Sequence, residues 1–130
     1  MIAIETMTPT TDVPSRVAGL RREPAPVDLV HLARQTFGSA ELEREVLRLF
    51  VQQGGGLVRL IATSEDARTR GEFAHRLKGS ARAIGATRVG RIAEAIETAG
   101  AAEISGLVDD LGRAVEEVEL FVAALLAPAA

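Results

Sequence analysis

From residue 27 onward, apolar residues recur every three or four positions, with almost none of the alternation that strands require. This period predicts helices at about residues 28–37, 39–61, 63–84, 87–99 and 103–126. Gly38, Gly85 and Gly100 stand at three of the expected helix ends. Four long amphipathic helices with short connections predict an all-α fold, an antiparallel four-helix bundle with the short first helix across one end.

The apolar residues of the first two predicted helices define the faces that we expect to be buried. In the first, Leu29, Leu32, Ala33 and Phe37 are expected on one side. The stripe predicted for the second consists of Leu42, Val46, Leu49, Phe50, Gln53, Leu57, Leu60 and Ile61. Three glycines, residues 54–56, interrupt it at a cost of about 1 kcal/mol each relative to alanine. Because the stripe keeps its phase across them, we expect one continuous or kinked helix.

Composition narrows the class of protein. Residues 1–26 hold four of the five prolines and are predicted to be a flexible arm, with the bundle domain at residues 27–130. The chain has no cysteine, which excludes disulfides and thiolate metal sites, and its two histidines are 44 positions apart. With 15 basic and 18 acidic residues, the net charge of −3 argues against nucleic-acid binding. The absence of a secretory signal and of a membrane span predicts a cytoplasmic protein with no membrane association.

The helix predicted at residues 63–84 presents a histidine to solvent. With Leu77 at the centre of its buried face and about 100° per residue, Phe73, Ala81 and Ile84 fall within about 40° of that centre. His75 falls about 160° away and is therefore expected to face water. The other histidine, His31, lies outside the apolar face of its own helix and is predicted to be structural or incidental.

The neighbours of His75 suggest chemistry. Gly71 and Gly79 lie one turn before and one turn after it, which leaves space on both sides. Lys78, the only lysine in the chain, lies three positions on. A lysine ammonium can follow a phosphoryl group as a point charge, and a neutral imidazole is a competent nucleophile. The middle of a helix receives little help from the macrodipole, so a side-chain cation has to stabilise any phosphoryl group there.

Further polar residues surround this face. Arg68 and Arg82 lie seven positions before and after His75, on the same side of the helix. Glu72 is a candidate acceptor for one ring nitrogen, which would leave the other as the nucleophile, although a solvated surface charge is the alternative. Gln53 is expected either to reach the neighbourhood of His75 or to be a hydrogen-bonded amide in the core.

The segment His75-Arg76-Leu77-Lys78-Gly79-Ser80, followed by Ile84-Gly85-Ala86, resembles histidine-containing phosphotransfer (HPt) domains. The similarity covers about residues 27–126. It implies a helical bundle that takes a phosphoryl group from the aspartate of one receiver domain and gives it to that of another. The resemblance assigns His75 as phosphoacceptor, Lys78 as the phosphate-stabilising cation, Gly79 as the residue that gives access and Ser80 as a supporting polar group.

The resemblance also implies the surroundings of this activity. The partners would be receiver domains of response regulators and a hybrid or sensor histidine kinase, with Mg²⁺ held by the receiver and no cofactor here. The chain would be a monomeric phosphocarrier without an ATP site of its own, rather than an enzyme. Arg76 and Ala81 depart from the small polar residues often found at their positions. We expect Arg68, Arg76 and Arg82 to guide partner docking.

Three other functions compete with a relay. A helical adaptor could bind a receiver or kinase without carrying phosphate. The dimerising histidine domain of a sensor kinase also has an exposed helical histidine, but usually with a proline shortly after it, where this chain has Gly79. A nucleic-acid binder using the arginines of the third helix is disfavoured by the net charge and the lack of interleaved aromatic residues.

Overall fold

A computed structural model describes residues 25–128, and the predicted arm therefore lies, up to residue 24, outside the described residues. This part of the chain is all α-helical, as predicted. Its helices are α2 (Leu29–Gln35), α3 (Ala40–Thr63), α4 (Ala67–Ile84), α5 (Thr87–Thr98) and α6 (Ala101–Leu126). The predicted helices match these five in order and to within a few residues at each end.

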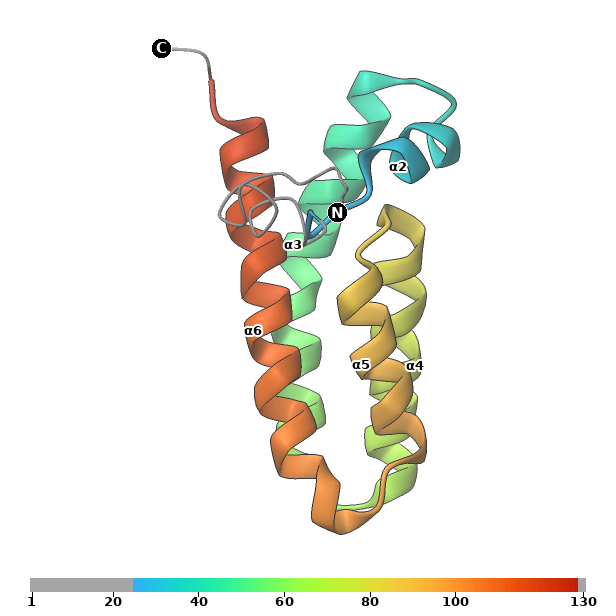
Figure 1. The fold of residues 1–130 in the computed structure, drawn as a ribbon, viewed down its shortest axis with the longest axis vertical. Coiled ribbons are helices and arrows are strands. Elements are labelled where there is room, and N and C mark those ends of the chain that lie inside the picture. The colour runs from blue at the N-terminus through green and yellow to red at the C-terminus, as the bar shows by residue number, and fades with distance from the viewer. Residues whose placement is uncertain (1–24, 129–130) are drawn as a thin grey trace, which may run out of the picture.

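The four long helices form an up-and-down bundle (Figure 1). Each packs on its neighbour in sequence, and α3 and α6 also pack on each other and close the bundle. The N-terminal part of α3 and the C-terminal part of α6 extend past the ends of α4 and α5, where α2 lies (Figure 1). The short helix therefore covers one end of the α4–α5 pair.

Helix α3 runs without a break through the three glycines. A Cβ at Gly54 would lie 3.5 Å from side-chain atoms of Phe50 and Val115, so α3 and α6 approach closely there. The predicted stripe is partly wrong because it was centred on large side chains alone. The true core face contains Leu47 and Gly54, whereas Leu42, Leu49, Leu60 and Gln53 of the predicted stripe are exposed.

Helix α2 is shorter than predicted, and its apolar face is different. Asp28 caps it, with its side chain accepting hydrogen bonds from the backbone of Val30 and His31. Leu32 is buried as expected, but Leu29 is exposed and Phe37 is 91% exposed. The helix ends at Gln35, and Phe37 adopts a left-handed conformation with φ of 54°, so its side chain leaves the helical phase.

Helix α4 begins at Ala67, three to four residues later than predicted. Its N-cap is Asp66, whose carboxylate accepts a hydrogen bond from the Thr69 backbone at 2.8 Å. That bond lowers the pKa of Asp66, because it favours the ionised form. The helix ends at Gly85 as predicted, with φ of 81°. A Cβ at Gly85 would lie 2.9 Å from the Asp28 carbonyl oxygen, so both the turn and the close chain contact require glycine.

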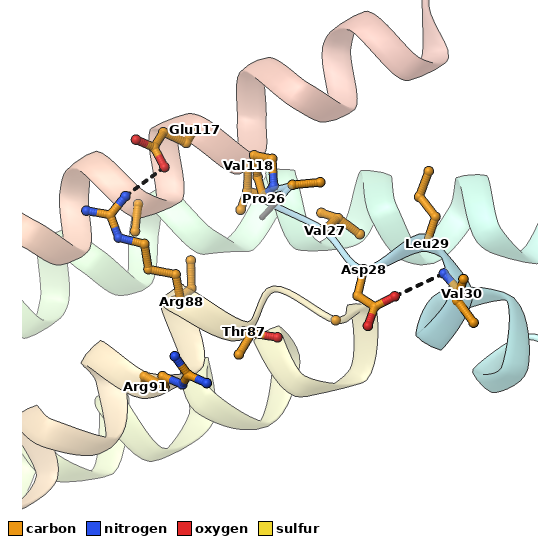
Figure 2. Close-up of a pocket in the computed structure, with 14 residues that line it drawn as sticks. Pro26, Val27, Asp28, Leu29, Val30, Thr87, Arg88, Arg91, Glu117 and Val118 are labelled. Carbon is orange, nitrogen blue, oxygen red and sulfur yellow. Dashed lines mark hydrogen bonds and ion pairs between the residues drawn. The ribbon is translucent and has the colours of Figure 1, made fainter. Parts of the chain in front are cut away.

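The segment before α2 packs against the α4–α5 turn, the start of α5 and the middle of α6 (Figure 2). Val27 is fully buried, and the Asp28 backbone N–H donates to the Gly85 carbonyl at 2.9 Å. A cavity of about 780 Å³ lies between this segment, the start of α5 and the middle of α6. Arg88 and Glu117 pair at 2.9 Å on its border (Figure 2).

Helices α5 and α6 also contribute apolar faces to the core, and Val89, Ala93 and Ile96 of α5 are buried. The buried positions of α6 include Leu111, Val118 and Val122, whereas Leu125, the last residue but one of the helix, is exposed. Among residues 25–128, no helix has both the length and the apolar character needed to span a bilayer.

Candidate functional site

His75 lies in the middle of α4 and points away from the core. Ala74, Leu77 and Ala81 of the same helix are fully buried, which confirms the predicted helix phase. The His75 side chain is 73% exposed. The apolar period of α4 thus places this imidazole on the surface, without any need for a special backbone conformation.

Glu97 of α5 joins His75 to Lys78. The His75 ring donates from Nδ1 to Glu97 Oε2 at 2.6 Å, and Lys78 Nζ donates to Glu97 Oε1 at 2.7 Å. Only 14% of the lysine side chain and 18% of the glutamate side chain are exposed. His75 and Lys78 therefore both donate to one carboxylate in the groove between α4 and α5, and only the imidazole extends into solvent.

The charge of Glu97 determines which nitrogen of His75 is free. The hydrogen bond from Lys78 holds the pKa of Glu97 below its ordinary value, the bond from His75 acts in the same direction, and partial burial opposes both. At neutral pH Glu97 is consequently a carboxylate, which can only accept hydrogen bonds. Nδ1 of His75 must then carry the proton, and in the neutral ring Nε2 holds the lone pair.

Glycines leave the surface around His75 open. A Cβ added at Gly79 would meet nothing within 4 Å, and one at Gly71 would come no closer than 3.9 Å to the Glu97 carbonyl oxygen. Packing within the described residues therefore does not require glycine at either position. Ser80 is half-buried, and its hydroxyl forms no hydrogen bond with His75, Lys78 or Glu97.

The carboxylate that holds His75 was not predicted. Glu72, the candidate from the sequence, pairs instead with Arg68 at 3.5 Å, one turn before it on α4. Glu97 was missed because it lies 22 residues away, on another helix. The sequence does contain a signal for this pairing. Residues that face each other across two antiparallel helices have nearly the same sum of residue numbers, and the pairs Lys78–Glu97 and Arg82–Glu94 both follow this rule.

The remaining candidate residues from the sequence each have a different environment in the structure. Arg82 pairs with Glu94 at 3.3 Å and lies on the side of α4 that faces α5. Arg76 lies over the ring of Phe73, 5.9 Å from its centroid. His31 is structural, because its Nε2 donates to the Arg82 carbonyl at 2.8 Å. Gln53 is exposed on α3 and is not the core amide that was one of its two predicted roles.

The surface at His75 is a shallow hollow of about 640 Å³. It is lined by Ala67, Arg68, Gly71, Glu72, His75, Arg76 and Glu97. The larger cavity lies at the other end of α5 and contains no histidine among its lining residues. Within residues 25–128 no group of three or more histidine, aspartate or glutamate side chains is placed to hold a metal ion.

A family model matches most of the chain and agrees with this fold. Residues 38–127 match the Hpt domain model, and the chain belongs to that family. Hpt domains are phosphocarrier modules that interact with receiver domains and kinases, so the chain has a phosphotransfer-type role in two-component signalling. The match begins after α2 and includes all of α3 to α6. A search of curated proteins and a search of solved structures each returned no similar protein.

Proposed function

We propose that this protein relays a phosphoryl group between the aspartates of two receiver domains, with Nε2 of His75 as its carrier atom. The observation that carries the proposal is the hydrogen bond from Nδ1 to Glu97, because it leaves the Nε2 lone pair on an exposed ring. The aspartyl phosphate of a docked receiver is within the reach of such an atom, since no side chain at Gly71 or Gly79 blocks the approach.

Phosphoryl transfer to His75 conserves charge and protons. The Nε2 lone pair forms the bond to phosphorus, the bond to the aspartate oxygen breaks, and its electron pair leaves with the partner's carboxylate. No proton moves, because Nδ1 keeps the one it donates to Glu97. The ring becomes a phosphorylated imidazolium, and the Glu97 carboxylate stabilises its positive charge. Transfer to the next receiver reverses these steps and returns neutral His75.

Lys78 supplies the cation that the incoming phosphoryl group needs. Its ammonium uses one of three N–H groups on Glu97, which leaves two to donate to phosphate oxygens. Because the side chain is held at 14% exposure beside the groove, its position is defined before the partner arrives. The receiver domain would provide the divalent cation, since phosphoryl transfer depends mainly on positioning and charge neutralisation.

We infer that exposed leucines of α3 add apolar contact area for the docked receiver. Leu42, Leu49 and Leu60 are exposed at spacings of seven and eleven residues, which puts them on one side of the helix. That side is about 120° from Gly55, which faces Glu119 of α6. Because α3 packs on both α6 and α4, this side of α3 is turned toward α4, and Leu49 and Leu60 would contact a receiver docked over His75. Leu42 lies in the first turn of α3, past the end of α4.

A transfer assay tests the proposal. A receiver domain phosphorylated with radiolabelled acetyl phosphate is mixed with the full chain, and the label on the chain is tested for acid lability and base stability. We expect label on the wild type, none on His75→Ala and normal labelling of His31→Ala, with unchanged helix content in both variants by circular dichroism. A labelled His75→Ala would overturn the assignment. An unlabelled wild type that still binds receivers would favour the adaptor.

A further inference from the structure

The charges around His75 are paired within the molecule, with one exception. Arg68 pairs with Glu72. Lys78 pairs with Glu97, and Arg82 with Glu94. Arg76 also borders the hollow, but in residues 25–128 it has no carboxylate within ion-pair distance. The surplus charge beside the imidazole is therefore a single guanidinium.

This guanidinium is held in place by an aromatic ring. Arg76 lies 5.9 Å from the centroid of Phe73, one turn before it on α4, within the range of a cation–π interaction. Phe73 is half-buried and packs against the core, so it is a fixed platform. A guanidinium that lies over a ring in this way still has N–H groups to donate to a planar acceptor. The side chain is thus prepared for a bidentate partner before docking.

The position of Arg76 favours a partner's carboxylate over the phosphoryl group as the acceptor. Seen along α4, Arg76 is about 100° from His75 in one direction, and Lys78 is about 60° from it in the other. Lys78 is on the side of Glu97 and holds the phosphoryl group in the proposed function. Arg76 is on the opposite rim of the hollow, where its charge meets the docked protein rather than the transferred group.

We propose that Arg76 binds a carboxylate side chain on the surface of the docking receiver domain and thereby selects among receivers. This inference rests on the proposed relay function. It gives the departure at position 76 from the family pattern a specific role, partner recognition. Each receiver that carries an acidic side chain facing Arg76 is recognised, and a receiver with a neutral or basic residue there is disfavoured.

The test compares the full-length wild type with Arg76→Gln, Arg76→Lys and the control Arg91→Gln. Arg91 is an exposed arginine on α5 that borders the other cavity, so its loss removes the same net charge outside the hollow that His75 lines. Purified receiver domains, phosphorylated with acetyl phosphate, serve as donors at several concentrations. The release of phosphate from each phosphorylated variant is also followed without a receiver.

For receivers that transfer well to the wild type, we expect Arg76→Gln to raise KM about fivefold with little change in kcat, as for the loss of one exposed ion pair. Arg76→Lys should recover less than half of this loss, because lysine lacks the planar fork. Arg91→Gln should stay within about twofold of the wild type, and the spontaneous loss of phosphate should be equal in all variants.

Two results would overturn the inference. Equal KM values for Arg76→Gln and Arg91→Gln would show that only general charge matters. Faster or slower phosphate loss from Arg76→Gln without a receiver would show that Arg76 holds the phosphoryl group itself. These failures are distinct from failure of the relay, in which the wild type would take no label from any receiver and both proposals would be wrong.

Discussion

Each of the two histidines makes one hydrogen bond to a neighbouring helix, His31 to α4 and His75 to α5. The chemical nature of the partner and the access to the ring differ between them. His31 donates from Nε2 to a backbone carbonyl and helps hold α2 against α4. His75 donates from Nδ1 to a carboxylate and exposes the rest of its ring. A carbonyl partner orients the ring but has no net charge with which to stabilise a positive charge on it. A carboxylate partner fixes the ring and also stabilises a positive charge on it.

The difference extends to the space around each ring. Two glycines flank His75, and the part of its ring that is free faces solvent. His31 is half-buried, and its Nε2 is already used. The two histidines therefore differ in hydrogen-bond partner and in access to the ring. The three predictions that follow change the access to His75, the partner of His75 and the His31 ring, one at a time.

The largest effect is expected from closing the access to His75. Gly79→Leu should lower the rate of phosphoryl transfer on the order of 100-fold, because a side chain that displaces the receiver by even about 1 Å separates the reacting atoms. Folding should not suffer, since a Cβ at this position meets open space and leucine favours helix. Transfer kinetics and thermal unfolding measure the two effects.

Gly106→Leu on α6 is the matched control for this change. A Cβ at Gly106 also meets nothing within 4 Å, and that residue is on a different helix from His75. Its transfer rate should equal that of the wild type. If Gly79→Leu transfers as fast as Gly106→Leu, the open surface at Gly79 has no part in docking.

A smaller loss is expected from neutralising the carboxylate that His75 and Lys78 share. Glu97→Gln should slow transfer about tenfold, as expected for the loss of one charge-assisted hydrogen bond to the reacting imidazole. It should also increase the population of the Nε2–H tautomer, because the amide can donate as well as accept. Nitrogen NMR of the imidazole reports the tautomer, and the transfer assay reports the rate.

Glu94→Gln serves as the comparison, since Glu94 lies one turn earlier on α5 and pairs with the exposed Arg82. Its tautomer and rate should remain those of the wild type. An unchanged His75 tautomer in Glu97→Gln would contradict the role given to this carboxylate.

The smallest effect concerns His31 and should appear in stability alone. His31→Ala removes one hydrogen bond to a backbone carbonyl and should lower the free energy of unfolding by about 1 kcal/mol. Phosphoryl transfer should be unaffected. Urea denaturation of His31→Ala and His75→Ala tests this contrast, and an equal loss of stability in both would show that the two rings do not divide their roles as described.

The apolar period predicted α4 closely because its buried face is made of side chains that are all apolar. The same reasoning was less accurate for α3, where the true face includes Gly54, a residue that adds no hydrophobicity of its own. It was wrong for Phe37 because the helix ends two residues before it. Errors of this kind arise where the buried face of a helix is determined by a close contact between helices or by a turn. Large apolar side chains do not mark such a face in the sequence.

The sequence by itself determined an all-α bundle and an exposed His75 with Lys78 on the same helix, since a period of 3.6 residues fixes which side chains share a face. Tertiary structure alone decided that Glu97 holds His75, that Glu72 does not, and that Lys78 is paired. These contacts join residues on two helices, and their register depends on how α4 and α5 pack. No local period contains that information.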